Sequence, residues 1–284
     1  MNIDIITERL KNYGAKTKQE EINAIKEIYQ EIALCGLARG DFFKYAAFQG
    51  GTCLRILYGL KRFSEDLDFI LLATDPSFKW EKYLKAIELE FNSLGLTLEI
   101  FDYSNTDSAV KKALLKEHVF RKLLMLKHDL LPSDKQIIKI KLEVDVNPPN
   151  GSTYETKYLD YPYPFSILCQ DLPTLFATKI HSIFCRKYSK GRDWFDFLWY
   201  VSKKASINYT FLQAALFQTG PFKNKKIIVD KDWVIEQLKK KIDETDWKEI
   251  KQDIAPFLKA DDQRILQEWN KFLFHAMLQK FSIS

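Results

Sequence analysis

Cysteine is scarce in this sequence, and its few copies do not cluster. Only four of the 284 residues are cysteine, and each lies in a separate apolar segment: Cys35, Cys53, Cys169 and Cys185. They have neither the paired spacing of a zinc site nor the density of a disulfide framework. We interpret them as core residues of a protein in a reducing compartment.

Long hydrophobic runs are also missing. No stretch approaches the roughly 18 apolar residues that a membrane-spanning helix needs, and the first residues carry no basic region followed by an apolar run. The sequence lacks internal repeats, low-complexity tracts and glycine/serine linkers as well. We therefore expect a folded, cytoplasmic protein with no membrane partner.

A large excess of one charge is absent. The 43 basic and 38 acidic residues give a net charge of +5, which is mild for a protein whose affinity for nucleic acid rests on neutralising phosphates. This balance permits RNA or nucleotide partners without requiring them. The 46% hydrophobic content is enough for the core of one large or two ordinary domains.

The chain changes character near its middle, which predicts two domains, 1–165 and 166–284. In the first we expect helices over 18–37, 52–58 and 80–94 and strands over 45–49, 67–72, 96–101, 119–126 and 135–146. After a loop rich in proline and tyrosine over 153–164, we expect helices over 171–187, 193–202, 209–217, 231–242, 246–258 and 262–281. The predicted fold class is α/β: a short mixed sheet flanked by helices, followed by a helical lobe that completes a cleft.

Two aspartates stand one residue apart in an apolar strand-like segment, after a glycine pair. Residues i and i+2 of a strand point to the same face, so Asp66 and Asp68 would present two carboxylates in one direction while Leu67 faces the core. Parallel carboxylates repel each other unless a cation sits between them, and oxygen ligands at this spacing suit Mg²⁺ bound together with phosphates.

A second polar face lies on the strand expected over 135–146. There Lys141, Glu143 and Asp145 alternate with apolar residues, so a third carboxylate is available on the polar face of a strand, as with Asp66 and Asp68. Asp-x-Asp on one strand and an acid on the next form the metal cradle of a two-ion phosphoryl or nucleotidyl transferase. The Gly50-Gly51 pair lets the backbone and the start of the following helix approach a phosphate.

Each of these features also has a simpler interpretation. A glycine pair is commonly a turn, and Asp-x-Asp is commonly the solvated face of an edge strand. Glu143 and Asp145 alone would serve as cross-strand partners of nearby lysines. Only the combination in one chain favours a site.

Charged residues in the second half point the same way. Lys179 starts an apolar helix and is costly to bury unless it meets a phosphate or a carboxylate. Asp193 and Asp196 are three apart at an expected helix start, so one can cap the helix while the other orients a basic group. His181 is expected to be an ordinary core or surface histidine.

Two arginines flank the first motif, and their roles stay open. Either Arg55 or Arg62 could contact a triphosphate, and Arg55 could equally pair with Asp66 or Glu65. A basic run from Arg186 to Arg192 is expected on a loop between two helices, where it could hold an RNA backbone.

These motifs carry a resemblance to a known family. The stretch FQGGTCLRILYGLKRFSEDLDF, residues 48–69, closely resembles the first motif of the AbiEii/AbiGii toxins, nucleotidyltransferase-like proteins of bacterial toxin-antitoxin and abortive-infection systems. The similarity continues in the family's order through IKLEVDVNPP and LFATKIHSIFCRKYSKGRDWFDFLWY, and so covers about residues 48–200. The last ~80 residues carry no matching motif.

The resemblance implies a nucleotidyltransferase fold and a role for each matching residue. It implies a phosphate loop formed by Gly50, Gly51 and Thr52. It implies that Asp66, Asp68 and a third acid are metal ligands and catalytic acids. It also implies cationic and acidic site residues on the later helices, namely Lys179, Arg192, Asp193 and Asp196. We favour Asp145 as the third acid, with Glu143 as second choice. Arg55, Lys179 and Arg192 would help to bind the nucleotide.

The implied reaction moves a nucleoside monophosphate from a nucleoside triphosphate (NTP) to a hydroxyl, with Mg²⁺, or Mn²⁺ in its place, and release of pyrophosphate. The implied acceptor is the 3′ end of tRNA, whose modification would block translation, and the implied partner is a separately encoded antitoxin that forms no stable complex. Two alternatives remain: a regulator that binds GTP or ATP without turnover, and a metal-dependent nuclease. Nuclease sites commonly have an acid-x-Lys order, whereas the order here is Lys141-Leu142-Glu143.

Overall fold

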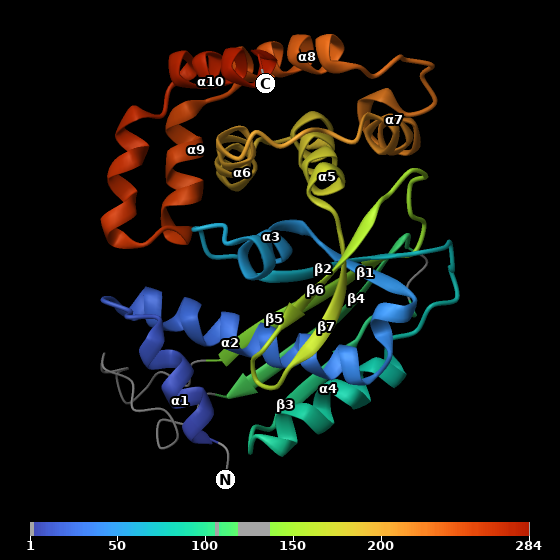
Figure 1. Ribbon diagram of the computed structural model, residues 1–284, viewed down its shortest axis with the longest axis vertical. Coiled ribbons are helices and arrows are strands. Elements are labelled where there is room, and N and C mark those ends of the chain that lie inside the picture. Colours follow the sequence, from blue (N-terminus) through green and yellow to red (C-terminus); the bar gives the residue numbers. More distant parts are fainter. Residues whose placement is uncertain (1–2, 106–107, 119–136, 284) are drawn as a thin grey trace. The chain divides into compact units, whose positions relative to one another are not determined.

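The computed structural model describes residues 3–105, 108–118 and 137–283, and the chain divides into two compact units. The units comprise Met1–Gly59, Phe63–Pro148 and Thr156–Cys169 for the first, and Leu60–Arg62, Pro149–Glu155 and Gln170–Ser284 for the second. Figure 1 shows the course of the chain.

A seven-stranded mixed sheet forms the centre of the first unit, in the order β3-β4-β5-β2-β1-β7-β6. Its strands are β1 Ala46–Gln49, β2 Asp66–Leu71, β3 Leu98–Asp102, β4 Val110–His118, β5 Ile137–Asp145, β6 Tyr154–Leu159 and β7 Phe165–Gln170. β2 pairs antiparallel with β1 and parallel with β5, so the acid-bearing strand lies in the middle of the sheet (Figure 1).

Four α-helices accompany this sheet among the described residues: α1 Ile3–Asn12, α2 Lys18–Arg39, α3 Gly50–Tyr58 and α4 Glu81–Ser93. The hydroxyl of Thr17 accepts a hydrogen bond from the N–H of Glu20 at 3.2 Å and so caps α2. α2 packs on α4 so closely that a Cβ at Gly36 would lie 2.7 Å from Cα of Ile87. Helix α2 is therefore fixed to α4 by a contact that only glycine permits.

Aromatic side chains fill the core beside β2. The ring of Phe42 lies 4.9 Å from the ring of Phe69, 5.5 Å from that of Trp80 and 4.9 Å from that of Tyr83, measured between centroids. Phe69 alternates with the aspartates along β2, so packing of this cluster holds the opposite, acid-bearing face of the strand outward.

The second unit is helical. Its α-helices are α5 Leu172–Cys185, α6 Gly191–Ser202, α7 Tyr209–Gln218, α8 Lys231–Glu244, α9 Trp247–Ile254 and α10 Lys271–Ile283. The carboxylate of Asp171 caps α5 by accepting from the N–H of Thr174 at 3.0 Å. In the core, Phe176 stacks on Tyr200 at 4.2 Å and Trp247 stacks on Phe274 at 4.0 Å between ring centroids. Most of the long helical apolar patterns are thus confirmed as helices.

The structure confirms the α/β class with a helical second part, and it corrects several element predictions. The helix expected over 262–281 is confirmed only in its second part, α10, which a 3₁₀ helix, Ala260–Glu268, precedes. The carboxamide oxygen of Asn270 accepts from the N–H groups of Phe272 and Leu273 at 3.0 and 3.1 Å, which starts a new helix there.

Three strands were not predicted. β6 lies within the segment taken as a loop over 153–164, and β4 and β7 lie where no strand was expected. The strand expected over 119–126 falls outside the described residues. No helix of the described part is both long and apolar enough to cross a membrane. The cysteines are unpaired; Cys35, Cys53 and Cys169 are buried, as predicted for core residues, whereas Cys185 is half-buried.

Candidate functional site

The turn from β1 into α3 requires glycine at its first position. Gly50 has φ +79°, and a Cβ there would lie 2.4 Å from Oδ2 of Asp68. The residue before it, Gln49, is extended and makes no side-chain cap of α3. The carboxylate of Asp68 therefore lies against the N-terminal turn of α3, where helix N–H groups favour negative charge.

The other two residues of the expected phosphate loop, Gly51 and Thr52, lie in the first turn of α3. The side chain of Thr52 is fully buried, and its hydroxyl donates to the backbone carbonyl of Asp66. This hydroxyl thus fixes the start of β2 to α3 instead of facing outward. A role for Thr52 at a phosphate is left to its backbone N–H.

Asp66 and Asp68 are half-buried on one face of β2, while Leu67, Phe69 and Leu71 are buried on the other. The alternation predicted from the sequence is therefore confirmed. In the parallel pairing of β2 with β5, Asp66 is opposite Lys141 and Asp68 is opposite Glu143. Paired residues of neighbouring strands share a face. We call Asp66, Asp68, Lys141 and Glu143 the strand-face cluster.

Glu143 lies between two lysines of its own unit. Its Oε1 forms ion pairs with Nζ of Lys141 and, at 3.3 Å, with Nζ of Lys112 on β4. Burial raises the pKa of Glu143, but the bonds to Lys141 and then to Lys112 outweigh burial, so the net pKa is lowered. The cross-strand pairing considered from the sequence is present, and Glu143 is ionised at neutral pH.

Asp145, the favoured third acid, has a different environment. It pairs with Ile70 rather than with either aspartate of β2, and its Oδ1 accepts from the N–H of Asn147 at 2.9 Å. Burial raises its pKa, and the Asn147 bond opposes this only partly. The register thus places Glu143, not Asp145, directly beside Asp68.

The donor set fits one hard cation better than two. Among residues 3–105, 108–118 and 137–283, no group of three or more His, Cys, Asp or Glu side chains is arranged to hold a metal ion. Asp66 and Asp68 supply oxygen ligands of the kind Mg²⁺ prefers, and the N-terminus of α3 is beside them. Glu143 would join them only after moving from its lysines.

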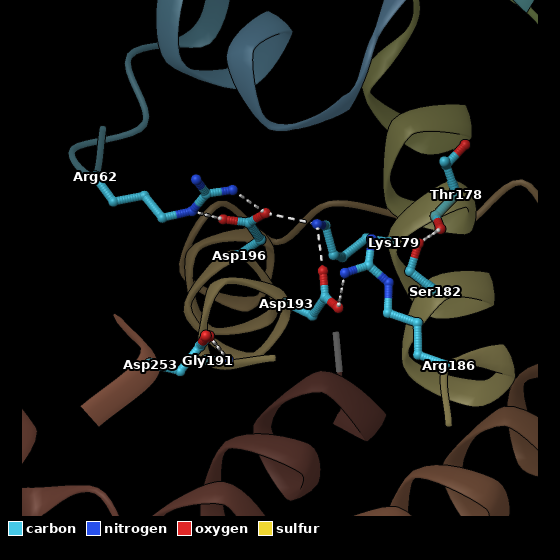
Figure 2. A network of polar contacts seen from close by, with 9 residues as sticks. All are labelled: Arg62, Thr178, Lys179, Ser182, Arg186, Gly191, Asp193, Asp196 and Asp253. Carbon is cyan, nitrogen blue, oxygen red and sulfur yellow. Dashed lines mark hydrogen bonds and ion pairs between the residues drawn. The ribbon is translucent and has the colours of Figure 1, made fainter. Parts of the chain in front are cut away.

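A second set of charged residues lies inside the helical unit. Arg62 forms two hydrogen bonds of 2.7 Å with the carboxylate of Asp196, and both side chains are at most 2% exposed (Figure 2). Nζ of Lys179 lies 2.7 Å from Oδ1 of Asp193 and 2.8 Å from Oδ2 of Asp196. With Arg186, 3.4 Å from Oδ2 of Asp193, these side chains form what we call the buried ion-pair network.

The network explains how a lysine can be buried on an apolar helix. Burial lowers the pKa of Lys179, but the charges of Asp193 and Asp196 outweigh it, so the net pKa is raised. Burial likewise raises the pKa of Asp196, and Arg62 and then Lys179 lower it below its ordinary value. Lys179 meets carboxylates, one of the two kinds of partner that its sequence position predicted.

Of the two roles considered for the acidic pair, capping of α6 is not found. α6 begins at Gly191 with Lys190 as its N-cap, and the side chain of Lys190 makes no capping hydrogen bond. The N–H of Gly191 instead donates to Oδ2 of Asp253 at 2.7 Å (Figure 2). Asp193 turns to Lys179, and Asp196 orients Arg62 and Lys179, which agrees with the expected role of one acid in orienting a basic group.

The remaining candidates have further contacts. Nε of Arg55 donates to Glu27 at 2.8 Å, and its guanidinium lies 4.6 Å from the ring centroid of Phe63. Arg192 lies 4.4 Å from the ring centroid of Phe257. Burial lowers the pKa of His181, which is 3.1 Å from the hydroxyl of Thr219, as expected for an ordinary histidine.

The basic loop between α5 and α6 is exposed. Residues 186–190, which include Arg186, Lys187 and Lys190, are all on the surface, while Arg186 also reaches Asp193. The loop position predicted for the run from Arg186 to Arg192 is thus confirmed for 186–190, whereas Arg192 lies in the first turn of α6. The pairing of Arg62 with Asp196 could not be predicted, because no spacing in the sequence links two residues 134 positions apart.

The mixed sheet, the glycine turn before α3 and the acid-bearing strand β2 define a nucleotidyltransferase-type fold. JHP933 from Helicobacter pylori has a similar solved structure, with a TM-score of 0.52 and 17% identity over 90% of this chain and 92% of that one. MenT4, a nucleotidyltransferase toxin from Mycobacterium tuberculosis, matches with a TM-score of 0.49 and 14% identity over 99% of each chain. None of the curated proteins compared is similar enough in sequence to match.

The family follows from the sequence itself. The profile of the family described as "Nucleotidyl transferase AbiEii toxin, Type IV TA system" matches residues 32–273. The chain therefore belongs to the AbiEii nucleotidyltransferase toxin family. The resemblance noted from the three motifs is confirmed, and it extends through most of the helical unit.

Proposed function

We propose that this chain transfers a nucleoside monophosphate from an NTP to an acceptor hydroxyl, with the 3′ end of tRNA as the acceptor. The acceptor oxygen bonds to the α-phosphorus, the bond from that phosphorus to the bridging oxygen breaks, and pyrophosphate leaves with the electron pair. The hydroxyl proton passes to a carboxylate or to water. The observation that carries the proposal is the Asp66/Asp68 pair beside the N-terminal turn of α3.

The residues of the first unit would have separate roles in the reaction. Gly50, Gly51 and the N–H of Thr52 would receive the phosphates, and Asp66 and Asp68 would hold Mg²⁺ or Mn²⁺. Glu143 is our third carboxylate because it is in register with Asp68, and Asp145 is the second choice. A bound divalent cation would neutralise phosphate charge and make the acceptor hydroxyl more acidic.

The helical unit would supply cations. Lys179, with Asp196 orienting it, Arg192 and, from the first unit, Arg55 are proposed to bind the nucleotide. The exposed loop 186–190 would hold the RNA backbone. An antitoxin encoded separately would oppose the activity without a stable complex, in the cytoplasm, where NTPs and tRNA are present.

A second candidate, a regulator that binds GTP or ATP without turnover, has one specific observation in its favour. Glu143 is held by two lysines and would have to leave them to bind a metal ion. Such a protein would bind NTP tightly and release no pyrophosphate.

The test is label transfer to RNA. Purified chain, Mg²⁺, total bacterial RNA and each α-labelled NTP in turn are compared with an Asp66→Ala/Asp68→Ala variant. A control, Asp232→Ala/Glu236→Ala, removes the same charge from exposed positions of α8. We expect label on a tRNA-sized band with the wild type and the control only. NTP binding without labelled RNA would contradict the proposal and favour the regulator, and shortened RNA would favour a nuclease.

A further inference from the structure

The strand-face cluster contains a cation of its own. Lys141 is opposite Asp66 in the parallel register, one pair before Asp68 and Glu143, and its Nζ pairs with Glu143. Its side chain is 41% exposed, so it stands at the surface of the cluster and not beneath it. The ammonium group is thus on the same strand face as all three carboxylates.

The charges around Lys141 agree with this placement. Its Nζ pairs with Glu143, and the register sets Lys141 opposite Asp66 and one pair from Asp68. Its ammonium group therefore lies among the acids that a two-ion site would use.

The ion pairs of Glu143 favour one metal ion over two. Two ammonium groups, Lys141 and Lys112, already neutralise this carboxylate on the strand face that it shares with Asp66 and Asp68. A two-ion site commonly relies on carboxylates that are not already paired with protein cations.

We propose that the ammonium of Lys141 takes the place of a second divalent cation beside Asp66, Asp68 and Glu143, so that this chain binds one metal ion with each nucleotide. The inference rests on the proposed function only in taking the same site for metal and NTP. Lys112 reaches Glu143 from β4 and holds this carboxylate on the side away from β2.

Counting bound Mn²⁺ by electron paramagnetic resonance tests the inference. The full chain is mixed with one equivalent of an NTP analogue that has a methylene α–β bridge, and Mn²⁺ is titrated in. We expect one bound ion per chain for the wild type and two for Lys141→Met, whose side chain is similar in length but uncharged. Lys139→Met removes a lysine from the same strand and face, opposite Lys116, and is expected to leave the count at one.

Each outcome of this experiment either supports or overturns the inference. Two ions or none bound to the wild type, or a Lys141→Met count equal to that of the wild type when its thermal melt shows a folded chain, would overturn the inference. A count of one without label transfer to RNA would leave it standing and contradict the transferase. Label transfer with two ions bound would support the transferase and overturn the inference.

Discussion

Each unit of this chain gathers two aspartates with a lysine, but the two gatherings differ in exposure. In the helical unit, Asp193 and Asp196 are at most 4% exposed and Lys179 is 12% exposed. In the sheet unit, Asp66 and Asp68 are half-buried, and Lys141 is 41% exposed. Burial forces charges to satisfy one another during folding, whereas partial exposure leaves carboxylates able to take a ligand.

The charge balance of the two regions differs in sign. The buried ion-pair network has three cations, Arg62, Lys179 and Arg186, against two aspartates. The strand-face cluster together with Lys112 has an excess of one carboxylate. The first composition suits a phosphate and the second a metal cation. Substitutions in the buried ion-pair network should therefore destabilise the protein more than substitutions in the strand-face cluster, and this difference can be tested.

The largest effect is expected inside the buried network. Arg62→Met would leave Asp196 with one cation instead of two, and breaking a buried pair commonly costs about 3–5 kcal/mol. Urea denaturation of the purified variant would measure this loss. Lys240→Met, which removes the exposed pair of α8 with Glu236, is the control and should change stability by less than about 1 kcal/mol. A loss in Arg62→Met as small as in the control would remove the distinction between the two regions.

The second largest effect expected is the pH dependence of the stability that this network provides. The pKa of Asp196 is lowered from its ordinary 3.8 by Arg62 and Lys179, which overcome burial. Its stabilising effect is therefore fully present above the ordinary carboxyl range and is lost as pH falls through the lowered value. The difference in unfolding free energy between the wild type and Asp196→Asn should be largest at pH 7 and shrink below about pH 4. A difference that stays constant from pH 7 to pH 3 would refute this account.

A medium effect is expected at the two ends of α3, where Gly50 begins the helix and Gly59 follows it. Gly59→Ala adds only backbone strain, because Gly59 has φ +75° with nothing within 4 Å of the new Cβ, and should cost about 1–2 kcal/mol. Gly50→Ala adds a clash with Asp68 to the same strain, so it should cost more and also lower Mn²⁺ affinity. Denaturation and metal titration of both variants would measure the two effects. Equal Mn²⁺ affinity in both would show that Asp68 and the turn are independent.

The smallest effect on stability is expected in the strand-face cluster. Asp68→Asn keeps the shape of a half-buried side chain and removes one of two like charges, so stability should change by less than about 0.5 kcal/mol. Label transfer should nevertheless fall by about a hundredfold or more. Denaturation and label transfer on one preparation would measure both. A large loss of stability would mean that Asp68 is as structural as Asp196.

Local spacing in the sequence was enough to predict what a single element does. The period of two placed Asp66 and Asp68 on one face of β2, and the 3.6-residue period found the long helices. β4 was not predicted because its lysines interrupt the alternation of apolar and polar residues. It is recognisable only through its pairing with β3 and β5. The break at Asn270 escaped because apolar spacing continues across it.

Contacts between distant segments could not be predicted in the same way. The bond of Arg62 to Asp196 and the opposition of Lys141 to Asp66 depend on tertiary register, to which the sequence gives no local clue. The third carboxylate illustrates this limit. Proximity to the Val146-Asn147 segment favoured Asp145, whereas strand register brings Glu143 to Asp68.

The assignment of Leu60–Arg62 to the helical unit has a practical consequence for dissecting this protein. Three residues from between α3 and β2 complete a unit whose helices come from beyond residue 170, so no single cut in the chain yields that unit intact. A fragment starting at residue 170 would lack Arg62, and its Asp196 would lose both guanidinium bonds. Complementation by two co-expressed fragments, rather than truncation, is the suitable way to separate the roles of the two units.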